Sequence, residues 1–470
     1  MQKTFKSLRG KFKFPHTLVV IAIIIFFAAL LTWIIPAGEY ARITDEVTGK
    51  TVVDPSTYTN VESTPVNIFL IPFYLVQGLI TRAELIATIL LSGGAFHILT
   101  KSGAIHSSIA KVARKFSNKK GIFVFILTLV FALITTVKSV NTFIAFAPIT
   151  VMIALAMGLD SIVGVGVILI GGAVGFSTGT LNVSTTLLAQ ELGGLPLYSG
   201  IEYRAISLVV FFIVSVIYLI RYSNKIQANP ELSPMYDLDK EREEGVADLD
   251  SFGEMNTRKW LVLLTLLGTL VVIVYGGINL GWKISHNGAA FIWLGLISGM
   301  IMGYSPSTIA KYFVEGAKKM IGAALILGTA TAVSQVMGDG KILDPIVYGL
   351  NSILVTVPAF LQGSFMYVSN IVINALITSG SGQAAVVMPI LLPVADMIGM
   401  TRQTAILAFN FGDGFCNYIL PTSTALMGIL GVANIPYDRW MKFMWKLFLI
   451  WVVVGSVLVT IAQYIKLGPF

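Results

Sequence analysis

The chain has 470 residues, of which 55% are hydrophobic and only 12% charged, and it contains 44 glycines and 17 prolines. Soluble domains carry about 25% charged residues, so this composition indicates an integral membrane protein. The single cysteine excludes an internal disulfide, and four scattered histidines form no recognisable metal-ligand pattern. The net charge of +8 implies no nucleic acid partner, because much of the basic charge flanks apolar segments.

Thirteen runs of the chain carry no Asp, Glu, Lys or Arg. A helix rises about 1.5 Å per residue, so roughly 20 residues cross a hydrocarbon layer of about 30 Å. We therefore expect about a dozen membrane elements, the first of them an uncleaved anchor. The runs are residues 17–38, 63–81, 85–100, 121–137, 139–159, 161–190, 205–220, 260–282, 284–310, 320–338, 345–395, 414–437 and 447–465.

Two basic segments without acidic residues predict the orientation of the chain. Residues 1–13 carry five lysines and arginines, and residues 101–120 carry six. The positive-inside rule places both segments in the cytoplasm, so an even number of crossings separates them. Residues 63–81, interrupted by Pro65 and Pro72, are then expected to lie in the interface or to re-enter rather than cross.

The two hydrophobic halves show the same order of features. An offset of 241 residues brings Pro148 onto Pro389 and Gly158 onto Gly399. We expect an all-α polytopic membrane protein with two repeats that are inverted relative to each other, as in many transporters. Six candidate elements separate the two hairpins, whereas inversion needs an odd number of crossings between them. The expected parts are a first repeat at 1–220, with a re-entrant hairpin at about 135–158 and a broken helix at about 161–190; a polar linker at 221–259; and a second repeat at 260–470, with a hairpin at about 376–399 and a broken helix at about 403–430.

Polar, glycine-rich sequence interrupts the apolar runs around residues 135–142, 175–185, 378–383 and 410–424. Unpaired backbone amides are costly in hydrocarbon, so these breaks predict a protein-lined cavity whose N–H and C=O groups bind a ligand. Half-helix N-termini suit an anion, whereas unwound carbonyls and hydroxyls suit a cation such as Na+. The candidate substrate-binding residues are Lys138, Ser139, Asn141, Thr142, Thr180, Asn182, Ser379, Ser381, Gln383, Asn417, Thr422 and Ser423; the candidate coupling-ion residues are Asp413, Asn410, Ser177 and Ser184.

Several of these residues also have a purely structural interpretation. An intramembrane acid such as Asp413 usually marks an ion or proton path, but it can also cap a broken half-helix. Lys138 either contacts substrate or extends to the lipid headgroups. The polar residues of the second hairpin either bind ligand or satisfy their own backbone. His97 is interpreted as a packing residue, since no acid lies at helical spacing from it.

Six segments together carry a family resemblance: residues 15–18, 33–38, 93–96, 378–385, 409–415 and 421–423. They resemble the YfcC-like branch of the DcuC anaerobic carrier family, within the ion transporter superfamily, and the resemblance covers nearly the whole chain. It implies a secondary carrier with hairpin-bearing transport domains. Members of this group move C4-dicarboxylates or exchange basic amino acids such as arginine and ornithine.

One departure from these relatives bears on the charge of the substrate. Where YfcC-like relatives can carry an acidic pair at the first hairpin, this chain has Asn141 and Thr142, with Lys138 nearby. A lysine without acidic neighbours favours a carboxylate over an ammonium or guanidinium group. The residues therefore favour a small organic anion or a zwitterionic amino acid, if Asp413 is committed to the coupling ion.

We expect a secondary active transporter of a small organic anion or amino acid, working by alternating access and driven by an ion gradient or by exchange. The alternatives are a basic amino-acid antiporter and, in another class, a polytopic membrane enzyme or channel. We expect no enzymatic activity and no cofactor, with Na+ or H+ as the coupling ion and no other metal. The expected setting is the bacterial cytoplasmic membrane, multi-pass with a cytoplasmic N-terminus; the expected partners are the small-molecule substrate and the lipid bilayer, without nucleic acid, and a homodimer is compatible with this architecture.

Overall fold

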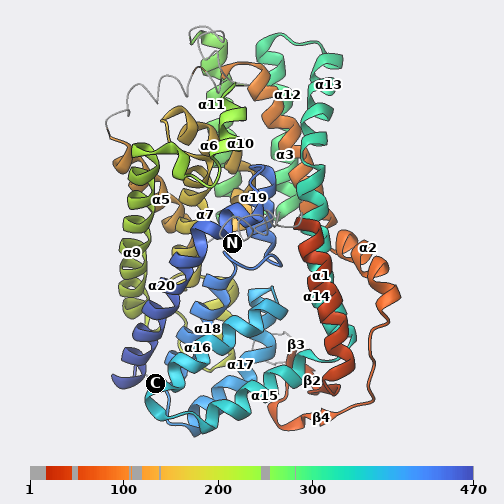
Figure 1. Cartoon of the computed structure of the whole chain (residues 1–470), viewed down its shortest axis with the longest axis vertical. Helices are drawn as coiled ribbons and strands as arrows, with labels where there is room; N and C mark the ends of the chain where they lie inside the picture. Colours follow the sequence, from red (N-terminus) through yellow and green to blue (C-terminus); the bar gives the residue numbers. More distant parts are fainter. Residues whose placement is uncertain are drawn as a thin grey trace, which may run out of the picture.

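The computed structural model describes residues 17–44, 51–104, 107, 119–136, 139–244, 255–280 and 282–468. Helices make up most of these residues, and two short antiparallel strand pairs lie between the first two long helices (Figure 1). Strand β1 pairs with β4, with Gly38 opposite Asn60, and β2 pairs with β3, with Arg42 opposite Val53. The expectation of a mainly helical membrane protein is confirmed.

The first half of the chain includes a C-terminal linker, which packs against the rest of the protein. Its elements are α1 (Thr17–Ile34), β1 (Gly38–Glu39), β2 (Arg42–Thr44), β3 (Thr51–Val53), η1 (Pro55–Thr57), β4 (Thr59–Asn60), η2 (Ile68–Leu70), α2 (Ile71–Thr81), α3 (Ala83–Lys101), α5 (Lys120–Thr135), η3 (Val140–Phe146), α6 (Ala147–Ala156), α7 (Ser161–Ser177), η4, a π-helical turn (Val183–Leu187), α8 (Leu188–Leu192), α9 (Ile201–Ala228), η5 (Pro230–Leu232) and α10 (Tyr236–Glu244).

The elements of the second half are all helices within the described residues. Its elements are α11 (Thr257–Asn279), α12 (Ile284–Met302), α13 (Pro306–Lys319), α14 (Ile321–Asp339), α15 (Leu343–Thr356), α16 (Ala359–Leu376), α17 (Gly380–Met397), α18 (Arg402–Cys416), α19 (Thr424–Val432) and α20 (Tyr437–Tyr464).

The helices after residue 119 and the helices after residue 358 share the residue types that end one helix and begin the next. Gly158 and Gly399 both have positive φ, +66° and +71°, a conformation that favours glycine because it has no Cβ. The next long helix in each half has a side-chain N-cap, Asp160 for α7 and Thr401 for α18, which accepts a hydrogen bond from the backbone three residues later. These capping residues are 241 positions apart.

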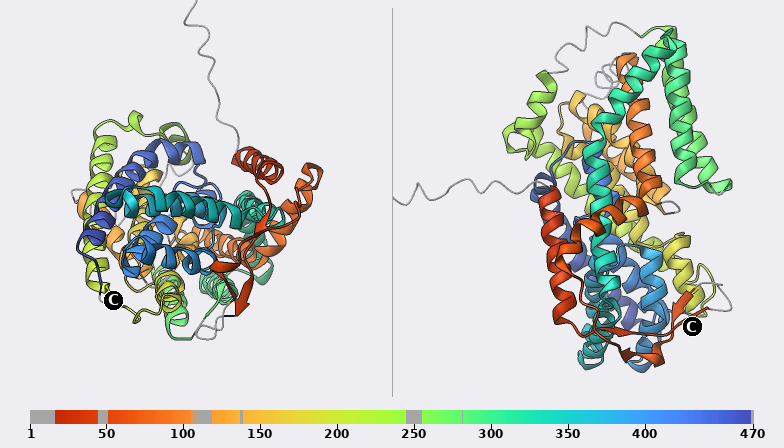
Figure 2. Two further views of the ribbon diagram at one scale, coloured as in Figure 1. Left: turned by 90° about the horizontal axis from the view of Figure 1, so that it is seen from below. Right: turned by 90° about the vertical axis from the view of Figure 1, so that its right-hand side faces the viewer.

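The helices gather into two bundles, each drawing on both halves of the sequence (Figures 1 and 2). The side bundle contains α1–α3 and α11–α14, in which α3 packs on α12 and α13 while α14 packs on α1 and α2. The main bundle contains α5–α9 and α15–α20, in which α5 and α9 pack on α7, and α16 packs on α18 and α20. The two bundles meet where α14 contacts α19 and where α3 contacts η3.

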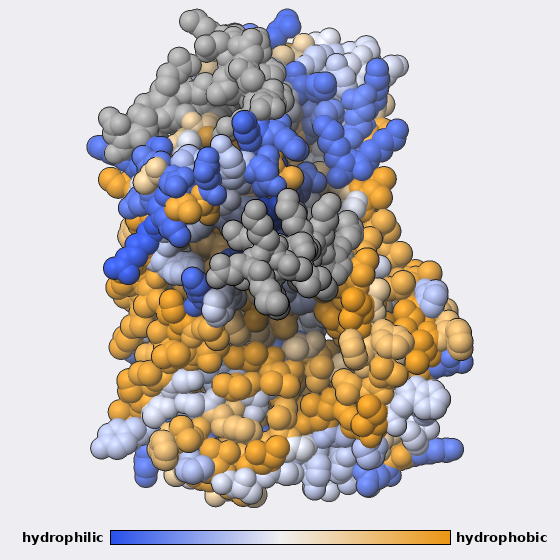
Figure 3. Space-filling view, in the orientation of Figure 1, coloured by the Kyte–Doolittle hydropathy of each residue, from blue (hydrophilic) through white to orange (hydrophobic). Residues whose placement is uncertain are grey.

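The lengths and surface of the helices suit a lipid bilayer. Among the described residues, five helices, α3, α9, α12, α16 and α20, are long and apolar enough to cross a membrane, and the bent pair α13–α14 would supply a sixth span. On the face drawn in Figure 3, hydrophobic residues form a broad belt and hydrophilic residues gather above it. The protein is therefore a multi-pass membrane protein.

Candidate functional site

The first polar break lies between α5 and α6, where the chain leaves one helix and begins η3. Ser139 caps η3, because its hydroxyl accepts a hydrogen bond from the backbone N–H of Asn141 at 3.4 Å. Ser139 is exposed and Asn141 is half-buried. The Oδ1 of Asn141 has no hydrogen-bond partner among the described residues, so it can still accept one. Lys138, the predicted cationic partner of a substrate, lies outside the described residues.

The second polar break lies between α16 and α17. Ser379 caps α17, because its hydroxyl accepts from the backbone N–H of Gly382 at 3.3 Å. Ser381, in the first turn of α17, is exposed, and its hydroxyl has no hydrogen bond within the described chain. The Ser379 hydroxyl therefore stabilises the backbone at the start of α17, whereas the Ser381 hydroxyl remains available to a ligand.

The remaining two breaks follow α7 and α18. After α7, Gly179 has a φ of +65°, and the Oδ1 of Asn182 then accepts from the backbone N–H of Ser184 and Thr185 at 3.1 and 3.3 Å, which begins η4. After α18, Ser423 caps α19 through a 3.4 Å bond from the N–H of Leu426. Both breaks are thus ordered by short polar side chains that replace a missing helical turn.

One cavity of about 190 Å³ lies where the four breaks converge. This volume suits a metabolite, since pockets for drug-sized ligands measure about 300–1,000 Å³. This lining agrees with the expectation that the four polar breaks meet around one cavity. The predicted residues that line the cavity are Ser139, Asn141, Ser184, Ser379, Ser381, Asn417 and Ser423.

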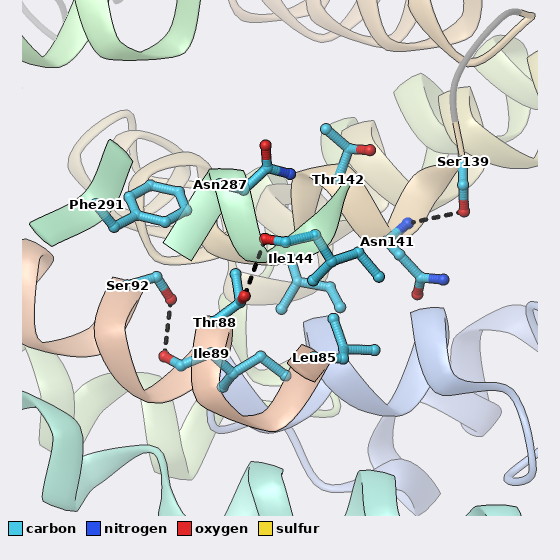
Figure 4. Close-up of a pocket in the computed structure, with 11 residues that line it drawn as sticks. Leu85, Thr88, Ile89, Ser92, Ser139, Asn141, Thr142, Ile144, Asn287 and Phe291 are labelled. Carbon is cyan, nitrogen blue, oxygen red and sulfur yellow. Dashed lines mark hydrogen bonds between the residues drawn. The ribbon is translucent and has the colours of Figure 1, made fainter. Parts of the chain in front are cut away.

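A smaller cavity of about 110 Å³ adjoins the first and shares Ser139 and Asn141 with it (Figure 4). Thr142, predicted to bind substrate, lines this second cavity together with Asn287 of α12 and Thr88 of α3. The Thr88 hydroxyl is already occupied, since it donates to backbone carbonyls of α3 and of residue 284. The second cavity therefore lies between the two bundles and is less polar than the first.

The other predicted residues are buried and do not line either cavity. Thr180, Asn182 and Gln383 are 7%, 3% and 0% exposed and line neither cavity, so their contact with a substrate stays a prediction. Five of these residues outside the cavities keep a buried polar atom without a partner in the described chain. These atoms are Ser177 Oγ, Thr180 Oγ1, Asn410 Nδ2, Asp413 Oδ2 and Thr422 Oγ1.

Asp413 lies in the last turn of α18, directly behind the cavity wall. A Cβ added at Gly380, which lines the cavity, would be 2.8 Å from Asp413 Oδ2 and 2.7 Å from the methyl group of Thr185. The carboxylate is therefore beside the N-terminus of α17 and next to the cavity, not at the start of its own helix. Only a glycine at position 380 lets the two helices approach this closely.

A hydrogen-bond network fixes one oxygen of this carboxylate. Asp413 Oδ1 accepts from Asn374 Nδ2 at 2.7 Å, and the same amide donates to Gln383 Oε1 at 3.0 Å. Gln383 in turn donates to the side chain of Asn370 at 3.1 Å. The other oxygen of Asp413 has no partner within the described residues, and a buried carboxylate oxygen without a donor is an attractive ligand for a cation.

Sequence reasoning missed three residues of this region. Asn370 and Asn374 lie one turn apart in the apolar helix α16, and this i, i+4 pair of amides is a signal that could have been used. Arg82, between α2 and α3, lines the main cavity but is 57 residues before Ser139, so only the tertiary fold reveals it.

The groups around the cavity can bind an anion and a cation at neighbouring positions. Hydroxyls, the start of α17 and Arg82 face the cavity, whereas unpaired oxygens of Ser177, Thr180 and Asp413 lie buried nearby. Hydroxyl and carboxylate oxygens suit a hard ion such as Na+. Within the described ranges, no three His, Cys, Asp or Glu side chains gather as a metal site.

A polar cavity enclosed by broken helices in an apolar helical protein is the arrangement of membrane transporters. Comparison with known proteins agrees, because residues 14–464 match the family described as DcuC, C4-dicarboxylate anaerobic carrier. The chain belongs to the DcuC family, and it is a transporter with transmembrane helices.

Two curated relatives match almost the full length of the chain. One, from Escherichia coli (strain K12), carries the name "Putative basic amino acid antiporter YfcC" and is 32% identical, covering 96% of each chain. The other, an uncharacterized protein from Haemophilus influenzae, is 27% identical and covers 96% of this chain and 97% of its own. The resemblance to YfcC-like members of the family is confirmed.

Two solved structures share a more distant likeness. The YdaH transporter of Alcanivorax borkumensis is 15% identical with a TM-score of 0.43, covering 97% of this chain and 100% of its own. MtrF of Neisseria gonorrhoeae, described within a class of antimetabolite efflux pumps, is 15% identical with a TM-score of 0.42, covering 97% and 96%. At these TM-scores the likeness assigns neither topology nor substrate.

Proposed function

We propose that this protein is a secondary active transporter that moves a small carboxylate-bearing substrate, an organic anion or an amino acid, across the bacterial cytoplasmic membrane by alternating access. The observation that carries the proposal is the cavity at the four breaks, whose lining of serine hydroxyls includes one arginine and, within the described chain, no acid. Such a lining stabilises a carboxylate, because hydroxyls and a guanidinium donate hydrogen bonds to it.

The architecture behind this proposal is a pair of repeats, residues 1–220 and 260–470, with one re-entrant hairpin and one broken helix each. It is supported by the matching glycines and caps of α7 and α18. An inverted pair would place the two hairpin tips on opposite sides of a central site. Single cysteines at Ser139 and Ser381, reacted with an impermeant thiol reagent from each side, test the arrangement; labelling of both from one side only would contradict it.

We further propose that Asp413 binds the coupling ion, Na+ or H+, with Ser177, Ser184 and Asn410 nearby. The support is the unpaired Oδ2 of Asp413 beside the cavity wall. An ion bound there would sit close to a substrate held at the start of α17, so that the two charges stabilise each other. The basic residues of the sequence before α1 support a cytoplasmic N-terminus.

Uptake into proteoliposomes tests the proposal. The purified protein should accumulate a labelled substrate from a panel of C4-dicarboxylates and neutral amino acids, with saturation and with dependence on an imposed Na+ or proton gradient. Uptake that never saturates and ignores both gradients would indicate a channel instead. Protein-free vesicles supply the background rate.

Exchange of basic amino acids is the second candidate function, favoured by the name of the relative from Escherichia coli. A guanidinium or ammonium side chain would need an acid in the cavity, and Asp413 lies behind Gly380. Competition separates the two candidates. Strong inhibition of uptake by arginine or ornithine, with none from dicarboxylates or neutral amino acids, would select the antiporter.

A further inference from the structure

Arg82 occupies an unusual position, at the junction of α2 and α3 where the side bundle reaches the cavity. Two hydrogen bonds hold this junction against α14. The Nε of Arg82 donates to Thr331 Oγ1 at 3.2 Å, and Gln335 donates to the hydroxyl of Thr81 at 2.8 Å. The guanidinium is therefore oriented by its own helix pair and by α14.

The charge of Arg82 is uncompensated within the described chain. Its Nε is bonded to a neutral hydroxyl, and its two terminal nitrogens have no hydrogen-bond or ion-pair partner among the described residues. The neighbouring acid Glu84 is exposed and accepts from the backbone N–H of Ser285 instead. Arg82 is also the one charged residue among the described residues that line the cavity.

A half-buried guanidinium without an acid is costly in a membrane protein, and such residues commonly face a substrate path. The two free terminal nitrogens form the planar fork that matches a carboxylate, with two parallel hydrogen bonds. The same cavity is lined by Ser379 and Ser381 and by the start of α17. Donors from the α2–α3 junction and from α17 are therefore available to one anion in this cavity.

We infer that Arg82 is a substrate-binding residue that pairs with a carboxylate of the transported molecule, with Thr331 as the residue that positions it. The inference rests on the proposed transport function and deepens it, because it names the partner of the substrate's charge. Arg82 belongs to the side bundle and the serines to the main bundle, so a bound carboxylate would bridge the two bundles.

The experiment measures whether the preference for a carboxylate depends on Arg82. Binding is read as the ligand-induced thermal shift of the full-length protein, titrated with three acids and their amides: succinate and succinamate, alanine and alaninamide, arginine and argininamide. The variants are Arg82→Gln, Arg82→Lys and Thr331→Val. Arg221→Gln, which removes an exposed arginine of α9 away from the cavity, is the matched control.

The wild-type protein should bind at least one acid more tightly than its amide. In Arg82→Gln the acid should lose at least roughly tenfold in affinity while the amide changes little, because a neutral side chain cannot form the charge-assisted bidentate pair with a carboxylate. Arg82→Lys should recover part of the loss, and Thr331→Val should fall between wild type and Arg82→Gln. Arg221→Gln should match wild type.

Two results would overturn the inference in distinguishable ways. If Arg82→Gln keeps the full preference for acid over amide, Arg82 is not the carboxylate partner, and the proposed transport function stands. If the wild-type protein binds none of the three acids and takes up none of them, the proposed carboxylate substrate fails together with the role of Arg82. An Arg82→Gln protein that fails to fold is replaced in the comparison by Arg82→Lys, whose ammonium lacks the planar fork and must therefore still reduce the preference.

Discussion

Two buried aspartates of this protein have opposite surroundings. Asp413, beside the cavity, is 1% exposed and accepts a single side-chain hydrogen bond, from Asn374. Asp160, in the loop before α7, is 5% exposed and has both oxygens occupied. Burial is therefore similar for the two acids, whereas the number of donors around each oxygen differs, and the roles that we propose for them follow this difference.

The surroundings of Asp160 explain its role. One oxygen accepts from the N–H of Val163, which caps α7, and the other accepts from the hydroxyls of Tyr222 and Ser233 at 2.5 and 2.6 Å. Asp239 of α10 accepts from the backbone N–H of Ser161 at 2.9 Å, so two acids lie at the start of α7. These bonds fasten the linker between the two halves to the main bundle.

Removal of the Asp413 carboxylate, which lies beside the main cavity, should have the largest effect on transport. Asp413→Asn keeps an oxygen for Asn374 but cannot hold a cation or cycle a proton. Gradient-driven uptake should fall roughly 100-fold, which corresponds to about 3 kcal/mol, with little change in Tm. Asp396→Asn, at an exposed acid, is the matched control. Uptake by Asp413→Asn that keeps the wild-type ion dependence would reduce Asp413 to a structural residue.

Removing the satisfied acid should affect stability instead of transport. Asp160→Ala leaves three buried donors without an acceptor, which costs about 3 kcal/mol and lowers Tm by a few degrees. Asp160→Asn should lose less, because an amide oxygen still accepts. Thermal unfolding in detergent measures both. A tenfold drop in the transport rate per folded molecule of Asp160→Ala would contradict the proposed difference between Asp160 and Asp413.

The pH dependence of stability should follow from the same residue. Burial raises the pKa of Asp160 from 3.8 to about 6, so the folded protein binds this proton more tightly than the unfolded chain. The contribution of this group is therefore favourable below pH 6 and declines as pH rises through the folded-state pKa, by about 1 kcal/mol between pH 5 and pH 7.5. The difference in Tm between these two pH values should shrink in Asp160→Asn. An unchanged difference would show that other groups dominate.

The two serines at the break between α16 and α17 repeat the comparison on a smaller scale. Ser379→Ala removes the cap of α17 and should cost about 1 kcal/mol in stability. Ser381→Ala removes a hydroxyl that no described residue uses, so Tm should stay constant while KM for the substrate rises a few-fold. Equal effects of the two variants on Tm and KM would contradict the distinction.

Local backbone chemistry was predictable from the sequence. Gly158 and Gly399 take positive φ, and Asn182, Ser379 and Ser423 cap the segments that follow the breaks. Each of these outcomes depends on a residue type and its immediate neighbours, so a single sequence contains the information.

Contacts between distant segments were not predictable in the same way. The sequence shows no acid at helical spacing from His97, yet Glu315 of α13, 218 residues away in the chain, lies 3.3 Å from its Nε2. Arg82 reaches the cavity for the same reason, since the packing of α2 and α3 on α14 decides its position. Helical spacing informs only about neighbours within one helix.

The sequence contains a single cysteine, so a thiol reagent can label this transporter at one defined position. Cys416 is 0% exposed, and its thiol donates to Asn374 Oδ1 at 3.2 Å, in the network that also holds Asp413. A maleimide can reach the sulfur only when α16 and α18 separate. The labelling rate of the wild-type protein therefore measures how often this helix pair separates, and no other cysteine has to be removed first. A comparison of the rate with and without ions or substrates shows whether they change that frequency.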